Sequence, residues 1–482
     1  MGKKVDISKV IGLFIGPLLF ALLLLLFRNS PEYPLFCVLA VASWMITWWV
    51  TEAIPIPATS LLPIVLLPLL GIFKVSEATA PYASSIIFLF MGGFLIALAL
   101  EKHNLHKRIA LNLLRLTGSS GNGIILGFMA ATALLSMWIS NTATAVMMLP
   151  IALSVANLLL KKDTEKLTRS EKNFSLGLML SIAYAANIGG SMTLIGTPPN
   201  VVMAGYLTEI LDYTMTFSSW FGIGLPVGFL LLTITYLLIT KLLFKNNLKK
   251  ITGSEQLVNS ELQKLGKISK SEKLVLTIFA ITAFGWIFKQ QINQLIGEPL
   301  LSDTVTAMAG GLLMFITPVH LKKNKFILKW EDTKKLPWGI LLLFGGGMCL
   351  ARAMEKVGII QLMGEFVKGQ GELPTTLIVL ITTAMVLFLT ELMSNVALIT
   401  IFIPVAIGIA QGLGINPLLL VIPATIASSC AFMMPISTPP NAIVFSSGYI
   451  KMKQMIRAGF LLNLIAIAVL VLLNMLLIEK IF

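Results

Sequence analysis

The chain has 482 residues, of which 56% are hydrophobic and only 12% are charged. A soluble domain carries about 25% charged residues, so this composition excludes an ordinary soluble protein and predicts a polytopic membrane protein. The net charge is +14, from 36 Lys and Arg residues against 22 Asp and Glu residues. Because the basic residues are spread over separate loops, they favour membrane topology over nucleic-acid binding.

Membrane-spanning helices are predicted along the whole chain, about eleven in all, from apolar runs of roughly 20 residues. Residues 1–33 form an N-terminal helix, because the first apolar run is longer than that of a signal peptide and has no small-residue cleavage site. The predicted spans begin near residues 10, 34, 57, 84, 173, 217, 272, 301, 338, 415 and 456. With the N-terminus in the cytoplasm, roughly four-fifths of the basic residues fall on the cytoplasmic side.

Two further apolar stretches, residues 122–160 and 373–412, are predicted to be re-entrant helical hairpins. Each has two apolar arms separated by a polar tip, Ser140-Asn141-Thr142 in the first hairpin and Ser394-Asn395 in the second. A buried amide that faced lipid would lose its hydrogen-bond partners at a cost of several kcal/mol. We therefore expect both tips to face protein, water or a ligand near the membrane midplane.

The second half of the chain repeats the first. Three pairs of segments match in the same order: FMGGFLIALALEK from Phe90 with FGGGMCLARAMEK from Phe344, SNTATA from Ser140 with SNVALI from Ser394, and GTPPNVV from Gly196 with STPPNAI from Ser437. The predicted topology opens the two hairpins toward opposite faces of the membrane. Residues 34–250 and 272–482 are therefore predicted to be inverted repeats, joined by a cytoplasmic linker at residues 251–271.

Each repeat also contains a broken helix, at residues 173–210 and 415–450, with the sequence Thr-Pro-Pro-Asn at the break. Adjacent prolines end a helix, and we expect Asn200 and Asn441 to begin half-helices whose amides point into a central site. Amide-rich helix ends suit carboxylates, and carbonyl-rich ends suit a hard cation such as sodium. Neither tip contains Arg or Lys, so the predicted anion site uses neutral dipoles.

Ionisable residues inside a membrane are functional candidates. Glu391 lies three residues before Ser394, and Glu52 lies near a predicted helix end. Either a proton relay or a structural pairing with a basic residue or a helix end is possible for each, and a structural role is favoured.

The fold class predicted from these features is an all-α integral membrane protein with inverted repeats, which is typical of alternating-access carriers. Repeats also occur in channels. An intramembrane enzyme is disfavoured, because the three histidines fall in predicted loops and no paired carboxylates occur at the centre. A permease for another anion, such as sulfate or arsenite, stays open.

The segment WWVTEAIPIPATSLLP from Trp48, taken with the two tips and the two TPPN breaks, resembles the divalent anion:sodium symporter family. The resemblance implies a plasma-membrane homodimer in which a transport domain moves like an elevator against a scaffold domain. It also implies a dicarboxylate substrate such as succinate, malate, fumarate or 2-oxoglutarate, and no cofactor apart from sodium as a coupling ion.

The resemblance also implies roles for residues at the tips and breaks. The implied substrate contacts are Ser140, Asn141, Thr142, Ser394, Asn395, Thr438 and Pro439. The implied sodium ligands are Ser136, Ser140, Asn141 and Gly189 in the first repeat, and Thr390, Ser394, Asn395 and Ser437 in the second. The family has Ser-Asn-Thr at both tips, but Val396 stands in place of the second threonine, so one hydroxyl contact is missing. The preference among dicarboxylates, and sodium symport against exchange, are left open.

Overall fold

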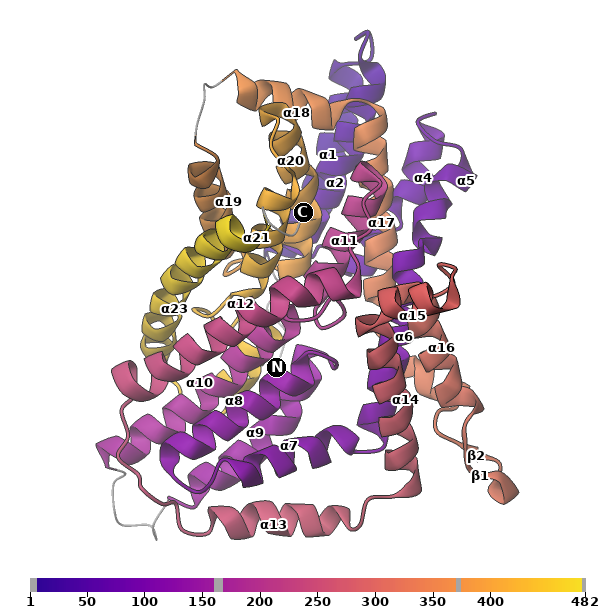
Figure 1. Cartoon of the computed structure of the whole chain (residues 1–482). Coiled ribbons are helices and arrows are strands. Elements are labelled where there is room, and N and C mark those ends of the chain that lie inside the picture. Colours follow the sequence, from indigo (N-terminus) through magenta and orange to yellow (C-terminus); the bar gives the residue numbers. More distant parts are fainter. Residues whose placement is uncertain (1–6, 160–167, 370–373, 479–482) are drawn as a thin grey trace.

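The structure is a computed structural model that describes residues 7–159, 168–369 and 374–478. The predicted hairpin ends at residues 160 and 373, the basic residues Lys3, Lys4 and Lys480, and most of the basic loop after the first hairpin lie outside the described residues. The described chain is almost entirely helical (Figure 1). Its two strands, β1 (Pro318–His320) and β2 (Lys325–Phe326), pair antiparallel in a small hairpin.

Each predicted span corresponds to a helix or a short pair of helices. These are α1 (Ile7–Leu26), α2 (Tyr33–Thr51), α3 and α4 (Ile56–Thr59 and Leu62–Leu69), α6 (Ser85–Lys102), α10 (Arg169–Ser191), α12 (Phe217–Leu237), α14 (Lys270–Ile287), α16 (Asp303–Ile316), α17 (Trp338–Lys356), α21 (Leu418–Ser429) and α23 (Met452–Leu473). Among the described residues, eight helices are long and apolar enough to cross a membrane, or nine if α14 and α15 (Lys289–Ile296), which are bent by 78° relative to each other, are counted as one span. The predicted spans near residues 57, 301 and 415 are shorter apolar helices.

Shorter elements connect these helices. They are α5 (Val75–Thr79), α7 (Leu105–Leu116), α13 (Ser254–Leu265), α18 (Ile359–Lys368), 3-10 turns at Ala80–Ala83, Leu321–Lys323 and Trp330–Lys335, and π-helical turns at Leu238–Leu243 and Asn474–Ile478. In Figure 1, α7, α13 and the β-hairpin lie at the bottom and α18 lies at the top. Three of the segments expected on the cytoplasmic side therefore lie toward one end of the molecule.

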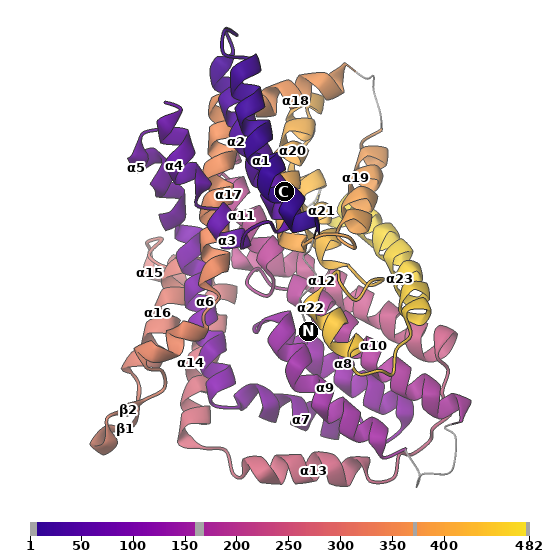
Figure 2. The ribbon, with the colours of Figure 1, turned by 180° about the vertical axis from the view of Figure 1, so that it is seen from behind.

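The two hairpins are present as predicted. The first consists of α8 (Gly121–Ser136) and α9 (Asn141–Asn157), and the second of α19 (Thr375–Leu389) and α20 (Asn395–Leu413). The first hairpin lies in the lower half of the molecule and the second in the upper half (Figures 1 and 2). α20 is also one of the eight helices that are long enough to span a membrane. The two hairpins therefore lie in opposite halves of the molecule.

Both broken helices occur where they are predicted. α10 is followed by α11 (Pro198–Leu211), and α21 is followed by α22 (Pro439–Phe445). α10 is buried throughout its apolar part and packs against both arms of the first hairpin and against α22. A side chain at Gly190 would collide with the amide of Asn141, and one at Gly189 would collide with the backbone of Ala133. Glycine at these two positions lets α10 approach the first tip closely.

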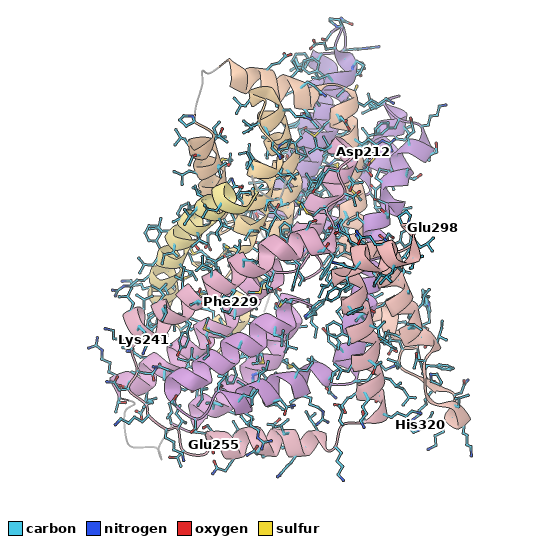
Figure 3. All side chains as sticks on the ribbon, viewed as in Figure 1. Asp212, Phe229, Lys241, Glu255, Glu298 and His320 are labelled. Atoms are coloured by element: carbon cyan, nitrogen blue, oxygen red, sulfur yellow. The ribbon has the colours of Figure 1, made fainter. Side chains whose placement is uncertain are left out.

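The predicted linker contains a helix. α13 lies along the bottom of the molecule (Figure 1), where Glu261 accepts from Lys107 of α7 at 2.8 Å and from Lys264 at 2.6 Å. These hydrogen bonds hold the pKa of Glu261 below its usual value. Figure 3 shows the labelled Glu255 and His320 in the same lower region. Phe229 is 70% exposed on the outer side of α12, as expected for a lipid-facing side chain.

Candidate functional site

Both tips and both breaks line a single cavity of about 1210 Å³. All of the implied substrate contacts are among its lining residues: Ser140, Asn141, Thr142, Ser394, Asn395, Thr438 and Pro439. Four segments that are far apart in the sequence thus converge at one place. The predicted meeting of the two repeats is present in the structure.

Each tip presents the beginning of a helix to this cavity. Ser140 is the N-cap of α9, and its hydroxyl accepts from Ala143 N at 3.2 Å. Ser394 is the N-cap of α20. The first N–H groups of a helix have no partner within the helix and carry part of a positive charge. The two tips therefore bring two anion-attracting ends to the same space.

Three neutral oxygen atoms lie close together behind the first tip. Ser136 Oγ lies 2.6 Å from Asn141 Oδ1 and 2.8 Å from Ala186 O, and Ser136 is fully buried. A hydroxyl has one proton and can donate to only one of these acceptors at a time. Such a cluster of neutral oxygens suits a hard cation.

The second tip has the same arrangement. Thr390 Oγ1 lies 2.8 Å from Asn395 Oδ1 and 2.8 Å from Ser428 O. Thr390 is fully buried, as Ser136 is in the first repeat. The two repeats therefore share a unit that consists of a hydroxyl, the tip asparagine and a main-chain carbonyl. This shared unit could not be located from the sequence, because the two carbonyls come from other helices.

Two of the implied sodium ligands have other contacts in the structure. Ser437 Oγ lies 2.7 Å from both Glu391 Oε2 and Met434 O. Gly189 lies against the backbone of Ala133, and its carbonyl accepts from Met192 N at 3.1 Å. The structure adds Ala186 O and Ser428 O as oxygens that lie closer to the tip hydroxyls.

The breaks differ from the sequence-based expectation. The half-helices begin at Pro198 and Pro439, and not at the asparagines. Proline fits the first position of a helix because its missing N–H has no role there. Asn200 and Asn441 are fully buried, and their amides donate to main-chain carbonyls left free where α10 and α21 end. Because two prolines remove two N–H groups from each start, the tips supply more donors than the breaks do.

Asn187 is a site residue that the sequence analysis missed. It lies on α10 of the first repeat, lines the cavity, and donates from Nδ2 to Thr438 Oγ1 of the second repeat at 3.1 Å. It thereby joins the two halves of the site. The sequence feature that could have identified it is an asparagine within an apolar run, just before two glycines.

Charged residues are also among those that line the cavity. Lys9 and Glu52 line it and form an exposed ion pair at 3.5 Å, and Lys335 and Glu101 line it as well. An exposed pair at this distance contributes little to stability, about 0–1 kcal/mol. Neither tip contains a basic residue, but these two lysines contribute to the lining elsewhere. The prediction that all three histidines lie in loops is wrong for His106, which lies in helix α7.

Comparison with solved structures supports the fold. The YdaH transporter of Alcanivorax borkumensis superposes with a TM-score of 0.63 at 16% identity, covering 92% of this chain and 98% of that chain. MtrF of Neisseria gonorrhoeae, from a class of antimetabolite efflux pumps, superposes with a TM-score of 0.57 at 11% identity, covering 83% of each chain. At these identities the likeness extends to the fold alone.

Sequence comparison identifies closer relatives. Two proteins named sodium-dependent dicarboxylate transporter SdcS, from Staphylococcus saprophyticus and Staphylococcus aureus, are each 42% identical to this chain over 477 residues. The match covers 98% of this chain and 91% of each relative. Residues 30–480 match the family described as the sodium:sulfate symporter transmembrane region. This protein therefore belongs to the sodium:sulfate symporter family of membrane transporters, as the sequence resemblance indicated, and is not an enzyme.

Proposed function

We propose that this protein is a secondary active transporter that moves C4 and C5 dicarboxylates across the plasma membrane by alternating access. Succinate, malate, fumarate and 2-oxoglutarate are the proposed substrates. The observation that carries the proposal is the meeting of two helix N-termini in one cavity, with no basic side chain at either tip. The names of the relatives that are 42% identical support the same substrate class.

The repeat symmetry fits a substrate with two carboxylates. Each tip offers a serine, an asparagine and a helix N-terminus, so one carboxylate can be bound at each tip. We propose that Ser140, Asn141 and Thr142 bind one end of the substrate and that Ser394 and Asn395 bind the other. Thr438 and Pro439 then contact the substrate from the second break.

Sodium is the proposed coupling ion. The clusters behind the two tips bring neutral oxygen atoms close together, and a cation at each would offset the charge of a dianion held by neutral groups. The proposed ligands are Ser136, Ser140, Asn141 and Gly189 in one repeat and Thr390, Ser394, Asn395 and Ser437 in the other. We add Ala186 O and Ser428 O to these sets, because of their distances to the two hydroxyls.

The proposed mechanism is an elevator movement in a homodimer, on the basis of the family resemblance. The two hairpins and the two broken helices would form the transport domain, and the remaining spans would form the scaffold. The N-terminus is proposed to be cytoplasmic. The gathering of α7, α13 and the β-hairpin, which carry basic residues, at one end of the molecule supports this orientation (Figure 1).

Counterflow in proteoliposomes tests the proposal. Vesicles preloaded with unlabelled succinate should take up labelled succinate, and sodium should accelerate net uptake into vesicles that contain no succinate. Uptake that depends on internal dicarboxylate, but not on sodium, would identify an exchanger. The absence of succinate uptake under every condition would contradict the proposed substrate.

Sulfate is the second candidate substrate, because the family description names it. Competition separates the two anions. We expect excess malate to inhibit labelled succinate uptake and an equal concentration of sulfate to leave it nearly unchanged. Inhibition by sulfate, but not by other dicarboxylates, would favour the second candidate.

A further inference from the structure

Glu391 is a buried carboxylate that the proposed binding chemistry does not use. It is 3% exposed and lies between the end of α19 and the second tip. Its two oxygens accept hydrogen bonds from four N–H donors: Phe432 N at 2.8 Å, Met433 N at 2.9 Å, Met434 N at 3.1 Å and Asn463 Nδ2 at 2.8 Å. Ser437 Oγ lies 2.7 Å from Glu391 Oε2 and also 2.7 Å from Met434 O, and it can donate its one proton to either.

All of these partners are neutral, and all but Asn463 come from one non-helical segment. This segment, residues 430–438, connects α21 to α22. An ionised carboxylate can accept from all four N–H groups at once, and none of these four groups could accept a hydrogen bond from a protonated carboxyl. Charge-assisted hydrogen bonds are also roughly twice as strong as neutral ones. The surroundings of Glu391 therefore match a fixed anion whose partners are main-chain amides, and not a basic side chain.

In the first repeat, the contact between the tip and the break does not involve a charged side chain. Met137 occupies the position equivalent to Glu391, and its main-chain carbonyl accepts a hydrogen bond from Thr193 Oγ1 at the first break. The first break, residues 192–197, is shorter and forms turns. The second break is longer and irregular, so its amides need acceptors from outside the segment.

We propose that Glu391 is a positioning residue that fixes the second break against the second tip. This inference rests on the proposed function. Glu391 is joined by only two intervening residues to Ser394 at the tip, and its hydrogen bonds hold the segment that ends at Ser437 and Thr438. The tip and the break then present their cavity-facing groups as one rigid unit. Asn463 of α23 supports the carboxylate from behind and does not line the cavity.

The three native cysteines provide a test that does not depend on transport. Cys430 begins the second break and is 1% exposed, whereas Cys37 and Cys349 are buried elsewhere in the fold. Modification of each cysteine by N-ethylmaleimide can be followed in the intact protein in proteoliposomes by peptide mass spectrometry. Cys37 and Cys349 then report general loosening, and Cys430 reports loosening of the break.

Glu391→Gln keeps the size of the side chain but turns one acceptor oxygen into an NH2 group that faces other donors. We expect modification of Cys430 to become about tenfold faster, with Cys37 and Cys349 unchanged, because the break opens locally. The KM for succinate should rise in the same variant. Met137→Gln is the matched control in the first repeat and should change the Cys430 rate by less than about twofold.

Unchanged Cys430 modification in Glu391→Gln, or an equal rise at all three cysteines, would overturn the proposal. Asn463→Ala is measured beside it, because it removes one donor but leaves the negative charge of the carboxylate, which by itself slows the reaction of a nearby thiol. It should give a smaller rise at Cys430 alone, and no rise would count against the proposal. Failure of the wild-type protein to transport succinate would reject the proposed substrate without affecting the cysteine result.

Discussion

The two tips are built from one repeated unit but are held in different ways. At the first tip, Trp138 stacks on Phe217 and Trp286 at ring distances of 6.0 and 6.3 Å and meets Phe279 edge-on at 4.9 Å. The equivalent residue at the second tip is Leu392, which is 69% exposed. Aromatic side chains from α12 and α14 cover the first tip, whereas the equivalent residue of the second tip is exposed.

The difference separates what the two repeats share from what they do not. Both keep a buried hydroxyl, a tip asparagine and a carbonyl at nearly the same distances. They differ in the residues that cover or fix the tip, such as Trp138 against Leu392 and Met137 against Glu391. The shared part is what a symmetric dianion and its cations would need, and the divergent part determines how firmly each tip is held.

The largest effect is expected at the tip asparagines. Asn141→Ala and Asn395→Ala each remove an amide that lines the cavity and leave a buried hydroxyl without its side-chain acceptor. We expect succinate uptake to fall at least about 100-fold in each variant, while the amount of protein in the membrane is unchanged. Near-normal uptake by both variants would refute the proposed site. A large loss in only one variant would show that the two tips do not contribute equally.

The buried hydroxyls offer a matched set of variants, because each repeat supplies the conservative substitution for the other. Ser136→Ala and Thr390→Ala should lower uptake about tenfold and raise the sodium concentration for half-maximal uptake. Ser136→Thr and Thr390→Ser keep the hydroxyl and should stay within about threefold of the wild type. Equal losses in the alanine variants and in the hydroxyl-preserving variants would show that side-chain volume, and not the hydroxyl, is what matters.

The unequal cover of the tips predicts unequal effects on stability. Trp138→Ala removes several aromatic contacts and should lower the free energy of unfolding by about 2 kcal/mol. Leu392→Ala changes an exposed side chain at the equivalent position and should cost less than about 0.5 kcal/mol. Thermal unfolding of the purified variants measures both. Similar shifts would contradict the assignment of the aromatic contacts to the first tip alone.

The smallest effect is expected where the second tip lacks a hydroxyl. Val396→Thr restores the Ser-Asn-Thr sequence, and Thr142→Val removes the hydroxyl from the first tip. Each should change the ratio of succinate to malate uptake by about two- to fivefold, because one neutral hydrogen bond to the substrate is gained or lost. Uptake ratios measured from mixtures of the two labelled substrates test this. No change in either variant would show that the side chains at these two positions do not contact the substrate.

Much of the fold can be predicted from the sequence because the signals are local. The length of an apolar run, a Ser-Asn tip between two such runs and a Thr-Pro-Pro-Asn break can each be recognised within a few residues. The start of the half-helices is predicted wrongly, because two prolines end one helix but also fit the first turn of the next. The Thr-Pro-Pro-Asn sequence alone does not show whether the next helix begins at the prolines or after them.

The remaining parts of the site depend on contacts between distant segments. The approach of Ser136 to Ala186 O requires α8 and α10 to pack closely, which Gly189 and Gly190 allow only once the helices have been placed. Lys335 lines the cavity from the 3-10 turn Trp330–Lys335, whose sequence contains no motif that points to the site. A single sequence contains no information about such distances, so these residues were found only in the structure.

The central claim is that one bound dicarboxylate contacts the tips of both repeats. Protection of both tips by the substrate tests this claim most directly. Ala143→Cys and Val396→Cys place reporters in the cavity wall, one on each tip, and the three native cysteines are buried. In the presence of sodium, succinate should slow the modification of both reporters with the same half-protecting concentration. Protection of only one reporter, or of the two at concentrations that differ more than about tenfold, would contradict a single site shared by the two repeats.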